Sequence, residues 1–297
     1  MELLQLKYFR TVARLEHMTK AAEQLHIAQP ALSRTISRLE EDLGVLLFDR
    51  VNRQIRLNAF GKTFLSKVEL ALSLLDEGKK EVMEMAGLER GTISIATNTL
   101  NCLSPAVEAF REKFPNVRFR INQIAPTETY SISELLEQGI TDLGFGPIAF
   151  GKPGIRECSV LQTKIFLAVP SGHRLEKQSS ITLEQAADEP FIEYKTGHPF
   201  RKANDEISRR AGIQRTILCE VDEPAALHGL VRSGLGVAFL PGCKWNDVAQ
   251  YSLLPIQDSD NKHTFFVSWN ETRYLSEAAR EFQYFLIDYY AKEGVSA

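Results

Sequence analysis

Cysteines and long apolar runs are scarce in this 297-residue chain, which excludes several classes of protein. No Cys-x-x-Cys pair occurs, so the sequence indicates neither a disulfide-rich scaffold nor a cysteine-ligated zinc site. No apolar run approaches the roughly 18 residues that a membrane span needs. The first residues, MELLQLKYFR, interrupt their apolar pattern with charges and lack the cleavage site of a secretory signal. We therefore expect a cytoplasmic protein with no membrane segment.

The four cysteines lie far apart in the sequence, and they are Cys102, Cys158, Cys219 and Cys243. In a cytoplasmic protein we expect them to be reduced and mostly structural. A different interpretation stays open for Cys102, because a thiol near the start of a helix is more acidic and more reactive toward oxidants.

Motifs of common enzyme classes are also missing. The chain contains no Gly-x-Ser-x-Gly elbow, no His-Glu-x-x-His pair, no phosphate-binding loop and no paired Cys/His ligand set. Its six histidines are scattered along the sequence. We therefore predict a protein that is not an enzyme, with no catalytic residue, no metal and no cofactor.

Charge of one sign is not in large excess, but it is unevenly distributed. The chain carries 35 basic and 38 acidic residues, a net charge of −3. Residues 1–68 hold 11 basic against 7 acidic side chains, and the remainder holds 24 against 31. A basic head on an acidic body can bind a polyanion at one end. Because the excess is modest, we expect two or more heads to act together.

Residues 19–39 predict two short helices joined by a tight turn. In the second helix Leu32, Ile36 and Leu39 recur at the spacing of a buried stripe. A helix with amides, hydroxyls and arginines on its outer face suits the major groove of double-stranded DNA. An ordinary amphipathic helix with a solvated face is the alternative. The candidate DNA contacts on this helix are Gln29, Pro30, Ser33, Arg34, Ser37 and Arg38.

The flanking residues strengthen the prediction of a DNA-binding head. Thr19 is the expected N-cap of the first helix of the pair, and Gly44 suits a left-handed C-cap after the second. Residues 48–58 alternate apolar and polar positions around a turn at Asn52, which predicts a hairpin, or wing. Its arginines, among them Arg50 and Arg53, are candidate contacts to phosphates or to a minor groove.

A single long helix is expected from residue 59 to residue 85. Its apolar positions lie close to heptad spacing, which favours pairing with a second copy of the chain. Packing against the C-terminal part of the same chain is the alternative. Residues 87–91, bounded by two glycines, predict a hinge.

Beyond the hinge the chain alternates strands and helices, which is typical of parallel sheets covered by helices. The expected strands are 92–96, 117–124, 142–146, 164–170, 191–194, 216–221, 236–241 and 264–269. An amphipathic helix is expected from about residue 276 to the end.

The run AAEQLHIAQPALSRTISRLEEDLGVLLFDR, followed by a basic hairpin and a long helix, resembles the amino-terminal domain of LysR-type transcriptional regulators. The later segments GITDLGFG and VRSGLGVAFLP resemble the sensor domain of the same family. Gln29, Pro30, Ser33 and Arg34 match the family's recognition-helix positions. Ala28 departs from the family pattern, since a helix-capping serine is common there.

The resemblance implies an α+β multidomain architecture. It comprises a winged helix-turn-helix over residues 1–58, a linker and dimerisation helix with its hinge over 59–90, and a sensor of two α/β lobes over 91–297. The sensor is similar to periplasmic binding proteins, with lobe I over 91–162 and 266–297 and lobe II over 163–265. The implied protein is a cytoplasmic homodimer or homotetramer that binds promoter DNA and a small-molecule effector and acts on RNA polymerase.

Ligands of open α/β sheets lie beyond the carboxyl ends of the strands. The resemblance places several of the loops there around one cleft between the lobes. Their polar groups, with the possible charge of His198 and Arg201, suit a small carboxylate, whereas Asp222 suits an amine. Helix capping is the alternative role for each threonine and asparagine. The candidate effector contacts are Thr97, Asn98, Thr99, Leu100, Thr127, Thr129, Gly146, Thr196, His198, Phe200, Arg201 and Asp222.

A binding protein that uses the sensor fold without DNA is the competing function. It leaves the first 58 residues unexplained, so we predict a ligand-responsive transcriptional regulator.

Overall fold

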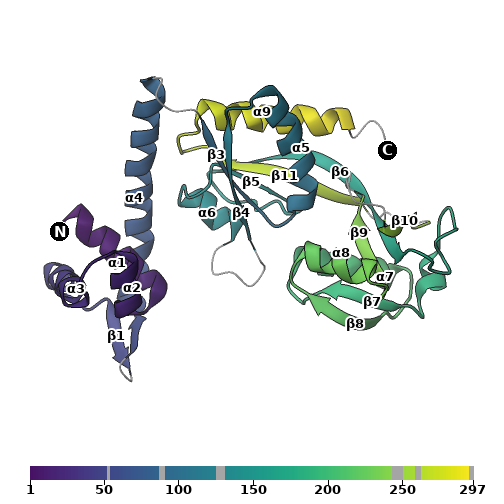
Figure 1. Cartoon of the computed structure of the whole chain (residues 1–297), viewed down its shortest axis with the longest axis horizontal. Coiled ribbons are helices and arrows are strands. Elements are labelled where there is room, and N and C mark those ends of the chain that lie inside the picture. Colours follow the sequence, from purple (N-terminus) through teal and green to yellow (C-terminus); the bar gives the residue numbers. More distant parts are fainter. Residues whose placement is uncertain (52–53, 87–90, 125–130, 243–249, 258–261, 294–297) are drawn as a thin grey trace. The chain divides into compact units, whose positions relative to one another are not determined.

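The computed structural model describes residues 1–51, 54–86, 91–124, 131–242, 250–257 and 262–293 (Figure 1). Contacts divide the chain into two compact units, Met1–Val82 and Met83–Ala297. The division falls near the end of helix α4 (Ala59–Met85), which therefore contributes residues to both units.

The core of the first unit is formed by three helices, α1 (Leu3–Leu15), α2 (Met18–Gln24) and α3 (Gln29–Leu43). Their apolar stripes meet because each helix repeats apolar side chains at helical spacing. Phe9 and Leu32 are fully buried in this core. The predicted stripe of α3 is confirmed, and its polar side is left outside the core.

The ends of these helices confirm one predicted cap and correct another. Gly44 closes α3 in the left-handed conformation with φ 73°, as predicted. The prediction that Thr19 caps α2 is wrong. The helix starts earlier, at Met18, and its N-cap is His17, whose imidazole Nδ1 accepts the N–H of Lys20 at 3.3 Å.

The predicted wing is present as an antiparallel hairpin of β1 (Phe48–Val51) and β2 (Gln54–Leu57), with its turn outside the described residues. Two carboxylates fix the hairpin to the helices. Glu16 accepts the N–H of Leu57 at 2.8 Å, and the buried Glu40 accepts the N–H of Leu47 at 2.7 Å. These bonds hold the wing beside α3, because an exposed two-stranded hairpin is only marginally stable by itself.

Helix α4 is capped by Asn58, whose side-chain oxygen accepts the N–H of Gly61 at 2.9 Å. Its first half packs into the three-helix core through Val68 and Leu72. The buried Glu69 receives two hydrogen bonds from the guanidinium of Arg14, which ties α1 to α4. The second half exposes apolar side chains, namely Leu74, Leu75 and Val82.

The second unit contains a seven-stranded mixed sheet in the part of the chain that the structure describes. Strands β3 (Thr92–Thr97), β4 (Arg118–Gln123) and β5 (Leu143–Gly146) run parallel, as predicted for lobe I. Three helices accompany them, α5 (Leu100–Lys113), α6 (Ile132–Glu137) and α9 (Glu277–Glu293). Phe110, Phe119 and Phe282 form an edge-to-face aromatic core between the helices and the sheet.

Lobe II carries a smaller parallel pair, β7 (Pro190–Tyr194) and β8 (Thr216–Val221). Its other elements are η1 (Leu183–Ala186), α7 (Pro199–Arg210), α8 (Pro224–Arg232), β9 (Ala238–Pro241) and β10 (Tyr251–Pro255).

Two long antiparallel strands, β6 (Ile155–Pro170) and β11 (Lys262–Asn270), run between the lobes (Figure 1). Sequence analysis predicted only the last seven residues of β6, because the first part alternates polar and apolar side chains and lacks a continuous apolar run.

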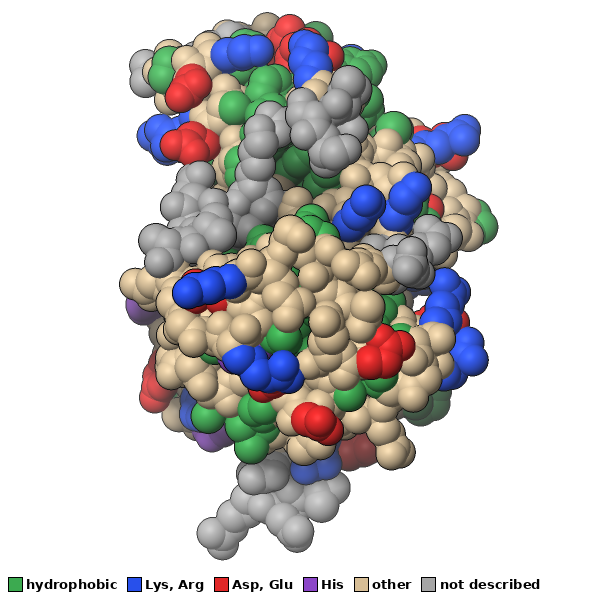
Figure 2. Space-filling model, turned by 90° about the vertical axis from the view of Figure 1, so that its right-hand side faces the viewer, with side chains coloured by type: hydrophobic (Ala, Val, Ile, Leu, Met, Phe, Trp, Pro, Cys, Tyr) green, Lys and Arg blue, Asp and Glu red, His purple; other side chains and the backbone are tan. Residues whose placement is uncertain are grey.

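No helix of the described residues is long and apolar enough to cross a membrane. Figure 2 shows basic and acidic side chains interspersed over one face of the molecule, without a large area of a single sign.

Candidate DNA-binding surface and ligand cleft

The outer face of α3 is uncovered within the first unit. Gln29, Pro30, Arg34 and Arg38 are exposed, and Ser33 and Ser37 are half-buried along the same helix. Neither Arg34 nor Arg38 has an ion-pair partner among the described residues. Cationic side chains held at helical spacing and left unpaired are available to phosphates and base edges.

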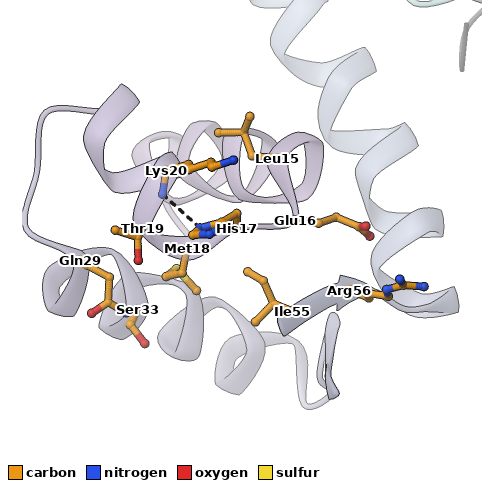
Figure 3. A pocket seen from close by; sticks show the side chains of 10 residues that line it. All are labelled: Leu15, Glu16, His17, Met18, Thr19, Lys20, Gln29, Ser33, Ile55 and Arg56. Carbon is orange, nitrogen blue, oxygen red and sulfur yellow. Dashed lines mark hydrogen bonds between the residues drawn. The ribbon is translucent and has the colours of Figure 1, made fainter. Parts of the chain in front are cut away.

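A hollow of about 570 Å³ lies between α2, the start of α3 and the hairpin (Figure 3). Its lining residues are Leu15, Glu16, His17, Met18, Thr19, Lys20, Gln29, Ser33, Ile55 and Arg56. Figure 3 shows Gln29 and Ser33 coming from α3, whereas Arg56 comes from β2 on the other side.

The hollow brings together three of the predicted DNA contacts, Thr19, Gln29 and Ser33. Pro30, Arg34, Ser37 and Arg38 lie elsewhere on α3. The side chain of Arg50 and the whole of Arg53 lie outside the described residues.

Sequence analysis missed His17 and Lys20 as parts of this surface. The sequence signal for them was their position: His17 directly precedes the first helix of the pair, and Lys20 lies in its first turn. An imidazole nitrogen is a hydrogen-bond acceptor and can cap a helix as a threonine hydroxyl does.

A cleft of about 970 Å³ in the second unit lies between α7, with the loop before it, and residues from lobe I. It is lined by Pro147, Ile148, Thr196, Gly197, His198, Pro199, Arg201, Lys202, Ala203, Asp205, Glu206, Arg209 and His263. Thr196, His198 and Arg201 are thus the predicted effector contacts that line this cleft.

His198 caps the start of α7, since its Nδ1 accepts the N–H of Phe200 at 3.2 Å. The ring stacks on Tyr194 with 3.9 Å between centroids and is only 2% exposed. Burial lowers the pKa of His198 to about 4, partly opposed by the charge of Asp222. The positive charge that the sequence left possible for His198 is therefore absent at neutral pH.

Arg201 keeps its charge, but two carboxylates and a carbonyl already receive its hydrogen bonds. The guanidinium donates to Glu220 at 2.7 Å, to Asp205 at 3.1 Å and to the carbonyl of Tyr194 at 2.8 Å. An incoming carboxylate would compete with these partners for the guanidinium of Arg201.

The predicted residues of lobe I lie at the carboxyl ends of β3 and β5. Thr97 and Thr99 are buried, and the Thr97 hydroxyl accepts the N–H of Thr99 at 3.0 Å. The Oδ1 atom of Asn98 is buried without a hydrogen-bond partner among the described residues. It lies so close to Gly146 that a Cβ there would stand 2.9 Å from it.

The remaining predicted contacts are dispersed. Leu100 is the first residue of α5, and the buried Phe200 packs edge-to-face on His263. Asp222 pairs with Lys195 at 2.6 Å. Thr127 and Thr129 lie outside the described residues.

Sequence analysis missed His263 as a cleft residue. Its ring is buried, its Nε2 has no hydrogen-bond partner among the described residues, and burial lowers its pKa to about 4. The alternation of His263 with Phe265 and Val267 on one face of β11 was the signal that it points inward.

Among the described cysteines, one differs from the sequence-based expectation, whereas Cys243 lies outside the described residues. Cys158 and Cys219 are free, as expected. Cys102, which is 3% exposed in α5, takes part in a disulfide, so the expectation of a reduced thiol is wrong there.

A winged helix-turn-helix with an uncovered polar face, together with a two-lobed unit that holds a cleft, defines a DNA-binding, ligand-sensing protein. Residues 3–62 match the family model of bacterial regulatory helix-turn-helix proteins of the lysR family. Residues 86–291 match that of the LysR substrate binding domain. The chain belongs to the LysR family of transcriptional regulators.

Curated relatives match along almost their whole length. The uncharacterized HTH-type transcriptional regulator YybE of Bacillus subtilis is 35% identical, with 98% of this chain and all of that protein covered. The transcriptional dual regulator GltC of the same organism is 32% identical, with 98% of both covered. These relatives are transcriptional regulators.

Solved structures of full-length regulators share the fold. CbnR, a LysR family transcriptional regulator, has a TM-score of 0.73 at 23% identity, covering 98% of this chain and 99% of that one. Full-length BenM has a TM-score of 0.55 at 28% identity, covering 99% of this chain and 98% of that one.

Proposed function

We propose that this regulator reads double-stranded DNA with α3 and the hairpin and binds a small-molecule effector in the cleft of its second unit. The observation that carries the DNA-binding surface is the uncovered face of α3, where Arg34 and Arg38 have no carboxylate partner among the described residues. The DNA contacts we assign are Thr19, Gln29, Pro30, Ser33, Arg34, Ser37, Arg38, Arg50 and Arg53.

We divide the chain into a DNA-binding domain over 1–58, a linker helix and hinge over 59–90, and an effector-binding domain over 91–297. The exposed Leu74, Leu75 and Val82 on α4 support a homodimer, since apolar side chains along one long helix favour burial against a second copy. The two heads of such a dimer would contact half-sites about one helical turn, ~34 Å, apart.

The effector is held mainly by hydrogen bonds in this proposal. His198 and His263 are neutral at pH 7, and the charge of Arg201 is met by Asp205 and Glu220. A ligand with hydroxyl, amide or amine groups fits these three side chains better than a carboxylate that would need their charge.

Binding in the cleft alters regulation by a population shift, because a ligand that binds one arrangement of the lobes more tightly favours that arrangement. The dimer or a dimer of dimers then holds its heads at a different spacing on the promoter, and RNA polymerase responds to that change. We assign the chain no catalytic role and a cytoplasmic location, where it meets both DNA and polymerase.

Selection of DNA by the full-length chain tests the proposal. The chain should enrich duplexes with a two-fold-related sequence from a random pool, and a metabolite that raises the melting temperature should change the footprint on the selected duplex. A pool without enrichment would overturn the DNA-reading role. Unchanged footprints with every stabilising metabolite would overturn the effector mechanism and leave the DNA-reading role intact.

A further inference from the structure

His17 lies at the junction of α1 and α2, on the surface of the first unit. Its backbone is extended, with φ −149° and ψ 107°, and its side chain is exposed. The Nδ1 atom accepts the backbone N–H of Lys20 at 3.3 Å. A nitrogen that accepts a hydrogen bond carries no proton, so in this capping state the ring is neutral and its single N–H is on Nε2.

The ring contributes to the lining of the hollow beside α3. Figure 3 shows the bond from Lys20 to His17, with Gln29 and Ser33 of α3 on one side and Arg56 of β2 on the other. Glu16 is the acidic residue of the lining, and it already accepts the N–H of Leu57.

Lys20 and Arg56 have no ion-pair partner among the described residues. Two unpaired cations, two hydroxyls and one side-chain amide around one hollow favour an anionic occupant.

We propose, on the basis of the DNA-reading role proposed above for α3, that His17 is a further DNA contact, which donates its Nε2–H to a backbone phosphate seated in this hollow. The face of α3 that reads bases borders the same hollow through Gln29 and Ser33, so a phosphate held there fixes the register of α3 on the duplex. The capping bond and the phosphate bond use the two nitrogens of one ring. The cap thereby selects the tautomer that donates to DNA.

The substitution His17→Asn separates the two roles, because an asparagine oxygen caps a helix well but the shorter side chain places no donor at the position of Nε2. His26→Asn is the matched control. His26 is an exposed histidine of the same unit, outside the lining of the hollow, with φ 54°, a conformation that asparagine tolerates.

The measurement is the dissociation constant of each full-length variant for a duplex that the native chain has selected from a random pool, taken over a series of salt concentrations. His17→Asn should weaken binding about 10-fold, the effect of losing one hydrogen bond to a charged group. The slope of log affinity against log salt should not change, because a neutral donor displaces no counterion. His26→Asn should bind like the native chain.

Lys20→Ala gives the reference for a charged contact and should reduce that slope by about 0.9. The proposal is overturned if His17→Asn binds like the native chain, because capping alone would then explain His17. It is also overturned if the loss accompanies an equal fall in the melting temperature, or if the salt slope falls as in Lys20→Ala.

Methylphosphonate substitution of single phosphates in the selected duplex distinguishes a phosphate from a base. One such position should weaken binding of the native chain and of His26→Asn more than it weakens binding of His17→Asn, because only the first two still have the His17 bond to lose, whereas all three keep Lys20 and Arg56. If no position shows this coupling, His17 does not bind a phosphate.

Discussion

Two arginines on the outer face of α3 and two arginines of lobe II are used in opposite ways. On α3, Arg34 and Arg38 point away from the core and have no carboxylate partner among the described residues. In lobe II, Arg201 and Arg215 each contact two carboxylates. Unpaired cations on a surface are available to an external polyanion, whereas paired cations stabilise the fold around them. The difference explains how an acidic chain binds DNA at one end.

The largest expected effect is the loss of stability when a buried, paired arginine is removed. Arg215 is 4% exposed at its side chain and pairs with Glu193, which is 1% exposed. Arg215→Ala leaves that carboxylate buried without its cation and should lower the free energy of unfolding of the second unit by about 3–5 kcal/mol. Urea unfolding of the full chain measures this. Arg209→Ala, which removes an exposed ion pair, should change stability by less than ~0.5 kcal/mol. Equal losses of stability in the two variants would contradict the difference between a buried and an exposed ion pair.

The neutral histidines of the second unit predict a dependence of stability on pH. Burial lowers the pKa of His198 to about 4 from 6.5, so below pH 6.5 the unfolded chain binds the proton and the folded chain does not. Stability from this group is full above pH 6.5 and is lost as the pH falls toward 4, by about 2 kcal/mol at pH 5.

His198→Asn keeps a capping acceptor and removes the titrating ring, so its stability should fall less between pH 7 and pH 5. Chemical unfolding of both chains at the two pH values checks this. An identical loss in the variant and the native chain would show that His198 does not contribute.

Removing an unpaired arginine of α3 should weaken DNA binding without lowering stability. Arg34→Ala should weaken binding to a selected duplex by about 1–3 kcal/mol and leave the melting temperature unchanged. Arg120→Ala removes an exposed arginine of β4 in the second unit and should leave DNA affinity unchanged. A gel-shift titration at fixed salt measures both. Equal affinity of Arg34→Ala and the native chain would remove Arg34 from the reading face.

The smallest effect concerns the start of α3, where Ala28 makes no side-chain cap. Ala28→Ser adds an acceptor for a free backbone N–H and should stabilise the first unit by about 0.5–1 kcal/mol. Thermal unfolding measures this, with Ala31→Ser, inside the first turns of the helix, as the control that should not stabilise. A lower melting temperature for Ala28→Ser would show that the serine does not cap the helix.

The two units also differ in how much the sequence predicted. The extent of α3, its buried stripe and its polar face were predicted because the spacing of apolar and polar residues over a few turns specifies both faces of a helix. Most strands of the second unit were predicted from their apolar runs. The first part of β6 and all of β10 were missed, because half-buried strands lack such runs.

The sequence by itself determined the reading helix, the wing and the family, since each depends on residues close together in the chain. Tertiary structure decided what the polar residues do. It left His198 neutral by burying its ring against Tyr194. It also met the charge of Arg201 with carboxylates from α7 and β8. Burial and charge pairing depend on neighbours distant in sequence, and no local pattern specifies them.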